Sequence, residues 1–70
     1  MKYASGDRLG SYIVFRDAEG RRHAVRQTAV LGVHETDEMQ TAVSLPGGRI
    51  ALLPERFGTV IEWLAAHHPR

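Results

Sequence analysis

The sequence predicts an α+β fold: a small antiparallel sheet of four or five strands, with one C-terminal amphipathic helix packed on one face. Three observations point to it. Short segments rich in β-branched and aromatic residues recur along the chain, turn residues separate them, and the last part has the apolar spacing of a helix. With 70 residues the chain forms one domain, and without cysteine it has no disulfide to reinforce a small core.

The N-terminal third predicts a polar lead-in and a β-hairpin. Residues 1–8 are polar, so the folded domain is expected to span residues 9–68. Residues 11–16 contain Tyr-Ile-Val-Phe, side chains that a pleated sheet favours, and predict the first strand. Residues 17–20 end in a glycine, which suits a hairpin loop, and residues 21–26 predict the returning strand.

The middle of the chain predicts a break and then further strands. Gln27-Thr28-Ala29 interrupts the pattern, and if the chain only bends there the sheet has four strands instead of five. The sequence Pro46-Gly47-Gly48 is a strong turn signal, because proline presets φ and glycine accepts a positive one. The other predicted segments are a strand at 30–34, a polar exposed loop at 34–40, and strands at 41–45 and 49–53.

An amphipathic helix is predicted to begin at Pro54 and to end before Pro69. Proline suits the first helical position, because the N–H that it lacks has no intrahelical partner there. We expect the buried face to centre on Phe57, Ile61 and Leu64. Trp63 then lies about 130° away from that centre, at 100° per residue. The apolar residues that carry the helical spacing are Phe57, Val60, Ile61, Leu64 and Ala65.

Nothing in the sequence predicts catalysis, a cofactor or a metal site. Nucleophile-elbow, P-loop and dinucleotide-binding patterns do not occur, and Gly47-Gly48 is accounted for by a hairpin turn. The four histidines lack the His-x-x-x-His spacing that places two imidazoles on one helical face. His67 and His68 are expected to be cations favoured by the helix dipole. We therefore expect a protein that is not an enzyme.

A small protein-binding or regulatory module is the predicted function. Trp63 lies off the expected buried face, so it either packs under the N-terminal arm or anchors a partner. Tyr12 belongs to a second sheet face that one short helix cannot cover. Open strand edges also invite pairing, so the partner is expected to be another protein or a second copy of the chain. The candidate residues are Trp63, Arg56, Thr59 and Tyr12.

A nucleic-acid-binding regulator is the alternative. A basic hairpin with a nearby aromatic side chain can follow phosphates and stack on bases. Residues 1–34 carry six basic and three acidic side chains, whereas residues 35–70 carry three basic and five acidic ones. The net charge of only +1 argues against this alternative. Its candidate residues are Arg16, Arg21, Arg22 and Arg26, of which Arg22 and Arg26 share a face if the strand alternates.

The segment from Arg22 to Leu64 resembles the small flagellar FlbD-type proteins. The resemblance rests on an apolar position, a break, two apolar positions three apart, an acidic loop, a hairpin with a Leu-x-x-Gly-like turn, and a helix with a Val-Ile pair. It implies a small accessory or regulatory protein without catalysis. The residues that carry it are Val25, Val30, Val33, Glu35, Thr36, Asp37, Ala42 to Gly48, Ile50 to Leu53, Val60, Ile61 and Leu64.

The same sequence leads us to expect a cytoplasmic protein with no membrane partner. Its N-terminal residues lack the apolar core of a signal peptide. Apolar runs such as residues 50–53 reach only four residues, far short of a membrane span. The lack of cysteine fits a reducing compartment.

Overall fold

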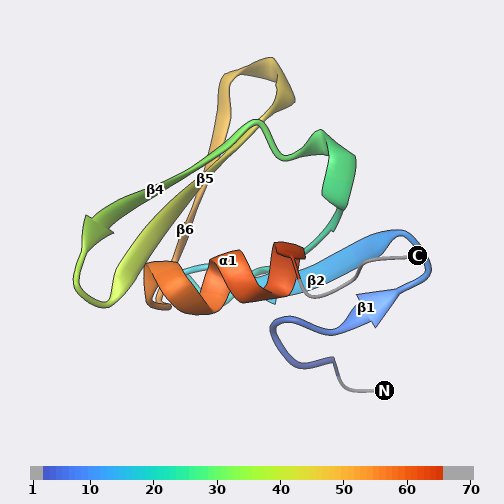
Figure 1. Ribbon diagram of the computed structural model, residues 1–70, viewed down its shortest axis with the longest axis horizontal. Coiled ribbons are helices and arrows are strands. Elements are labelled where there is room, and N and C mark those ends of the chain that lie inside the picture. The colour runs from blue at the N-terminus through green and yellow to red at the C-terminus, as the bar shows by residue number, and fades with distance from the viewer. Residues whose placement is uncertain (1–2, 66–70) are drawn as a thin grey trace.

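The computed structural model describes residues 3–65 and contains two three-stranded antiparallel sheets and one helix (Figure 1). The α+β class and the C-terminal helix are confirmed, whereas the single sheet of four or five strands is wrong. The first sheet contains β1 (Arg8–Leu9), β2 (Tyr12–Arg16) and β3 (Arg22–Arg26). The second contains β4 (Gly32–Asp37), β5 (Gln40–Leu45) and β6 (Arg49–Leu53). Each sheet keeps its strands in chain order.

The division into two sheets follows from the turn at Gln27. The predicted break is a short 3-10 helix, η1 (Gln27–Ala29), in which Val30 N–H donates to the Gln27 carbonyl at 3.3 Å. The Gln27 side chain accepts a hydrogen bond from Arg8 Nη1 at 3.3 Å and donates one to the Leu64 carbonyl. Gln27 therefore holds the turn against both β1 and the helix. The chain leaves this turn in a new direction, so the following strands form a separate sheet.

The polar segment 34–40 is exposed from His34 to Met39, as predicted, but it forms the tip of the β4–β5 hairpin and is not a loop throughout. Strand β4 continues to Asp37, and only Glu38 and Met39 form the turn before β5. The Thr36 hydroxyl donates to the Gln40 carbonyl at 3.1 Å across this hairpin. Residues 34–37 are all exposed, so both faces of the strand end accept polar side chains. A strand with two polar faces lacks the apolar alternation from which strands are predicted.

Helix α1 (Phe57–Ala65) begins three positions later than predicted. Pro54 and Glu55 form a bend between β6 and the helix. This bend is fixed by Thr41, a fully buried residue whose hydroxyl donates to the Glu55 carbonyl at 2.8 Å. The turn η2 (Pro46–Gly48) agrees with the prediction, with φ of +81° at Gly47 and +73° at Gly48. The predicted helix end at 66–69 lies outside the described residues.

The predicted buried face of α1 is right for Val60 and Leu64 and wrong for Phe57 and Ile61. Val60 is the buried helical residue, at 2% exposure, and Trp63 and Leu64 pack beside it against the core. Phe57 and Ile61, the expected centre of that face, are exposed at 37% and 38%. The apolar side chains of α1 extend around more of the helix surface than the two sheets can bury. The helix buries the part that includes the large indole, because the N-terminal arm provides a surface for it.

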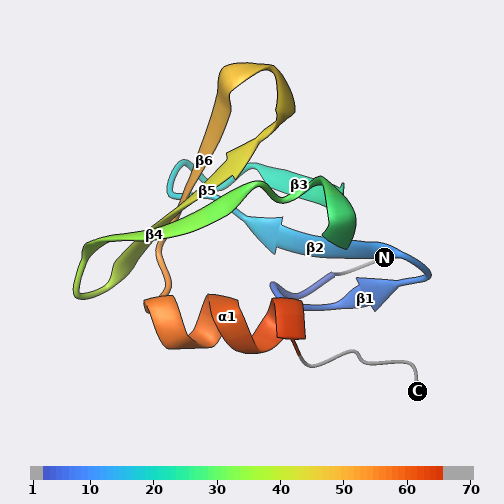
Figure 2. The ribbon, with the colours of Figure 1, turned by 45° about the horizontal axis from the view of Figure 1, so that its top comes forward.

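The core lies between the two sheets and α1, which runs along one side of both sheets (Figure 2). It consists of Ile13, Phe15, Val43, Ala51, Leu53 and Val60. Residues of the predicted lead-in also pair with β2: Gly6 N–H donates to the Val14 carbonyl at 2.7 Å, and Val14 N–H donates to the Asp7 carbonyl at 2.9 Å. The first sheet therefore extends back to Gly6 along the edge of β2 that pairs with β1.

Candidate functional site

The surface is hollowed where the outer strands of the two sheets face each other, β3 from the first and β6 from the second. Two adjoining hollows, of about 300 and 430 Å³, share His23 as a lining residue. We call them together the seam. The first hollow is lined by Asp17, Ala18, Glu19, Arg21, His23, Ile50, Ala51 and Leu52. The second is lined by Tyr12, His23, Ala24, Val25, Arg26, Ala29, Leu45, Pro46 and Arg49.

Backbone groups of β3 point into the seam at alternate residues. The Arg21 carbonyl accepts from Asp17 N–H at 2.8 Å, and Gln27 N–H donates to the Ser11 carbonyl at 3.4 Å, so both residues face β2. In an antiparallel ladder successive residues face opposite sides. The peptide groups of Arg22, Ala24 and Arg26 therefore face away from β2. Since β3 is the last strand of its sheet, they form an open edge.

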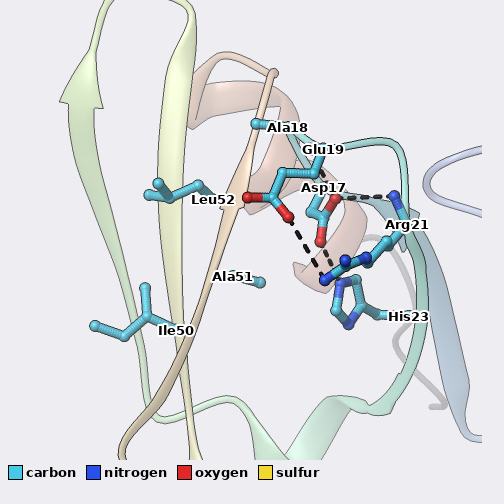
Figure 3. Close-up of a pocket in the computed structure, with 8 residues that line it drawn as sticks. All are labelled: Asp17, Ala18, Glu19, Arg21, His23, Ile50, Ala51 and Leu52. Carbon is cyan, nitrogen blue, oxygen red and sulfur yellow. Dashed lines mark hydrogen bonds and ion pairs between the residues drawn. The ribbon is translucent and has the colours of Figure 1, made fainter.

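Strand β6 presents a second open edge across the seam. The Leu52 carbonyl accepts a hydrogen bond from Ala18 N–H of the β2–β3 loop at 2.7 Å, so the peptide groups of Leu52 face away from β5. By the same alternation those of Ile50 do too. Figure 3 shows the side chains of Ile50 and Leu52 directed away from His23, while their backbone lines the hollow. The seam is thus bordered by main chain on both sides.

One end of the first hollow is closed by a hydrogen-bonded loop, from which Ala18 N–H donates to the Leu52 carbonyl (Figure 3). His23 Nε2–H donates to Asp17 Oδ2 at 2.8 Å, and Asp17 Oδ1 accepts the N–H groups of Glu19 and Arg21, each at 2.9 Å. The hydrogen bond from His23 is the main cause that lowers the pKa of Asp17, and the two backbone donors add to it. The His23 ring stacks on Phe15 with centroids 5.5 Å apart. This end of the seam is therefore held rigidly to the core.

The second hollow is basic and open. Arg26 at the end of β3 and Arg49 at the start of β6 are both exposed and both line it. The Arg26 guanidinium lies over the Tyr12 ring, 5.5 Å from its centroid. No acidic side chain is among the residues that line this hollow in the described part of the chain. Its remaining lining is largely apolar, from Val25, Ala29, Leu45 and Pro46.

The structure brings together three of the four arginines predicted for nucleic-acid binding. Tyr12 lies opposite Arg26 and Arg16 opposite Arg22 in the β2–β3 register, so all four side chains share the outer face of the first sheet. That Arg22 and Arg26 share a face is confirmed. Arg21 instead lies in the loop, where it pairs with Glu19 at 3.5 Å with both side chains exposed.

The residues predicted for protein binding do not form one surface. Trp63 is half-buried: it packs on the core and lies against Gly6 of the N-terminal arm, the first of its two predicted positions. Thr59 is half-buried, and the exposed Arg56 approaches Met39 Sδ at 3.2 Å through Nε. Tyr12 lies on the opposite face of β2 from the core residue Ile13. Sequence reasoning did not find the seam itself, because Ala24, Ile50 and Arg49 carry no local motif.

Other kinds of site find no support in the described residues. Between residues 3 and 65 no three histidine, aspartate or glutamate side chains come together in a way that could hold a metal ion. Within the same range, no helix has the length and apolar character needed to cross a membrane. Comparisons with protein-family models, with curated proteins and with solved structures match nothing.

Proposed function

We propose that the chain is a small protein-binding module that acts without catalysis and binds an extended segment of its partner at the seam. The observation that carries the proposal is the pair of open strand edges, β3 and β6, that border the seam. An exposed strand edge offers a row of unpaired N–H and C=O groups, and an extended peptide that pairs with it gains main-chain hydrogen bonds. The lack of cysteine suits binding in the reducing cytoplasm.

Strand β3 is the edge on which we expect the partner segment to pair. At β6 the β2–β3 loop already occupies the Leu52 carbonyl, which shortens the available edge. The outward groups of Ala24 and Arg26 have no such cover. The β2–β3 loop crosses to β6 at the first hollow, so we expect the partner to occupy the second. Main-chain pairing supplies the affinity, and the side chains that line the hollow supply the selectivity.

The test is to replace Ala24 by proline. Proline removes the N–H that points into the seam, and an edge strand tolerates proline at a position whose N–H faces outward. The matched control is Ala24→Val, which changes the exposed side chain but keeps the N–H. Heptapeptides displayed on phage are selected against the wild-type chain, and the best binders are measured against all three proteins by fluorescence polarisation.

We expect Ala24→Pro to abolish binding of the selected peptides and Ala24→Val to retain it. Amide hydrogen exchange on the wild-type complex should show new protection at Ala24. Peptides that bind the proline variant as tightly as the wild type, while its circular dichroism and urea unfolding show a folded domain, would refute strand addition at β3.

A second candidate function is binding of single-stranded nucleic acid by the outer face of the first sheet. Arg16 and Arg22 lie directly opposite each other without a carboxylate partner among the described residues. Like charges in that arrangement destabilise a sheet, and a bound phosphate would relieve the repulsion. The exposed Tyr12 on the same face is available to stack on a base.

This candidate predicts a strong salt dependence for binding of a labelled oligothymidylate. If Arg16, Arg22 and Arg26 each contact a phosphate, the slope of log K against log salt is roughly −2. The double variant Arg16→Gln/Arg22→Gln should lose most of that slope, whereas Ala24→Pro should leave it unchanged. Absence of oligonucleotide binding at low salt would exclude this function and leave the seam proposal untouched.

A further inference from the structure

We propose that the seam selects partner segments that carry an acidic side chain two positions away from an apolar one, with the carboxylate bound between Arg26 and Arg49. This inference rests on the proposed strand addition at β3 and adds the chemical class of the partner. It commits to a segment of a different protein and not to a second copy of this chain.

The charges around the seam are divided between its two ends. At the closed end, Asp17 is hydrogen-bonded to His23, and Glu19 forms an ion pair with Arg21. At the open end, Arg26 and Arg49 come from two different strands and line one hollow, and neither has an ion-pair partner among the described residues. The charge left uncompensated in the seam is therefore positive, and a negatively charged ligand complements it.

The Arg26 guanidinium is partly preorganised for a carboxylate. Its Cζ atom lies over the Tyr12 ring, 5.5 Å from the centroid, so a cation–π contact favours this position of the group. The N–H donors of a guanidinium lie in its plane, and their arrangement matches the two oxygens of a carboxylate. Arg49 borders the same hollow from β6, so the carboxylate would receive donors from both strands that border the seam.

The apolar lining accounts for the second part of the preference. Val25, Ala29, Leu45 and Pro46 provide carbon surface beside the two arginines and little hydrogen-bonding capacity. Successive side chains of an added strand point to opposite sides. A segment whose acidic residue reaches the arginines therefore directs its residues two positions away along the same side of the hollow, where an apolar side chain would cover this surface.

A second copy of the chain is a poor occupant of the β3 edge. Antiparallel self-pairing centred on Ala24 would set Arg22 of one copy directly opposite Arg26 of the other, and like charges directly opposite destabilise a pair of strands. The β4–β5 hairpin of another copy is the competing acidic occupant, since Glu35, Asp37 and Glu38 are exposed there. The experiment below separates it from a foreign peptide.

The experiment uses two random heptapeptide pools that differ only in a fixed central residue, glutamate or glutamine. Binding to the full chain is measured by fluorescence polarisation, for the wild type, Arg49→Gln, Arg49→Glu and the matched control Arg16→Gln, which lies on the first sheet outside the seam. We expect the wild type and Arg16→Gln to bind the glutamate pool roughly tenfold more tightly, a difference of about 1.4 kcal/mol. Arg49→Gln should lose most of this preference, and Arg49→Glu should prefer a third pool with central lysine.

Three results would overturn the inference, and they differ in what they leave standing. Equal binding of the two pools, abolished in both by Ala24→Pro, would leave strand addition intact and remove the acidic preference. Binding that Ala24→Pro does not reduce would remove the proposed function as well. Concentration-dependent self-association of the free chain, lost in Arg49→Glu and in Glu35→Gln/Asp37→Asn, would assign the seam to a second copy.

Discussion

Gly6 lies directly against the indole of Trp63, so closely that a Cβ atom on Gly6 would come within 2.6 Å of Nε1. The contact joins the N-terminal arm to the helix, two parts of the chain that no strand pairing connects. It is reinforced on both sides: Gly6 N–H donates to the Val14 carbonyl at 2.7 Å, and Arg8 Nη2 donates to the Trp63 carbonyl at 3.0 Å. The arm thus covers the indole of Trp63, for which the sequence allowed either packing under the arm or contact with a partner.

Gly6→Ala is predicted to destabilise the domain strongly. Gly6 has φ of +95°, a conformation that costs an L-residue roughly 1–2 kcal/mol, and the added methyl also displaces the indole, at about 1–3 kcal/mol for overpacking. The control is Gly10→Ala, which shares a positive φ of +61° but has nothing within 4 Å of the new methyl. Urea unfolding should give Gly6→Ala a loss at least about 1 kcal/mol greater than that of Gly10→Ala. Equal losses would show that the contact with the indole has no energetic weight.

Trp63→Ala is predicted to behave as a core truncation. Trp63 packs on the buried cluster and on Gly6, so its removal leaves a cavity and frees the arm. Because the residue is half-buried, we expect a loss of about 3 kcal/mol, the lower end of the range for a buried aromatic residue. Ile61→Ala, on the exposed side of the same helix, should cost less than about 1 kcal/mol. If thermal unfolding ranks the two variants in the opposite order, the helix presents its tryptophan to solvent.

The strands could be predicted where they contribute buried side chains. Residues 12–15 and 50–53 place β-branched, aromatic and leucine side chains beside clear turns, so the positions of β2 and β6 follow from local sequence. The end of β4 could not be predicted, because residues 34–37 bury nothing and so leave no apolar pattern. Phe57 and Ile61 were mispredicted because the helix has more apolar residues than the sheets can cover, and the arm at Gly6 packs on Trp63 instead.

The seam could not be predicted for a different physical reason. The turn between the two sheets contains Gln27, whose side chain donates a hydrogen bond to the Leu64 carbonyl, and this interaction between distant residues has no local signal. Ala24 and Ile50 are ordinary strand residues, and only the fold brings the edges that contain them to face each other. The grouping of Arg22 and Arg26 was predictable, since strand alternation alone sets it. The position of Arg49 beside Arg26 in the second hollow was not predictable, because Arg49 belongs to the other sheet.

Thr41→Val is predicted to loosen the connection between β6 and the helix. Thr41 is fully buried, and its hydroxyl donates to the Glu55 carbonyl at 2.8 Å in the bend before α1. Valine fills nearly the same volume but leaves that carbonyl without its donor, at about 1–2 kcal/mol. Thr41→Ser keeps the hydroxyl and removes a methyl group. Hydrogen exchange should therefore speed up at Val60, whose N–H bonds to the Arg56 carbonyl in the first turn, in Thr41→Val more than in Thr41→Ser. Identical exchange in the two variants would count against a role for the hydroxyl.

Asp17 is predicted to make the stability of the domain depend on pH in the acid range. Its pKa is lowered from the ordinary 3.8, chiefly by the hydrogen bond from His23, so the folded state holds the ionised carboxylate more favourably than the unfolded chain does. Linkage then requires that this contribution be fully present above about pH 4 and be lost as the pH falls through the lower pKa of the folded state. The difference in unfolding free energy between the wild type and Asp17→Asn, measured by urea titration, should shrink as the pH falls from about 6 to about 2.5. His23→Phe keeps an aromatic ring against Phe15 but removes the hydrogen-bond donor. In that background the effect of Asp17→Asn on the unfolding free energy should therefore change less with pH. A difference that stays constant with pH in the wild-type background would mean that the loop closing the seam is not held by this carboxylate.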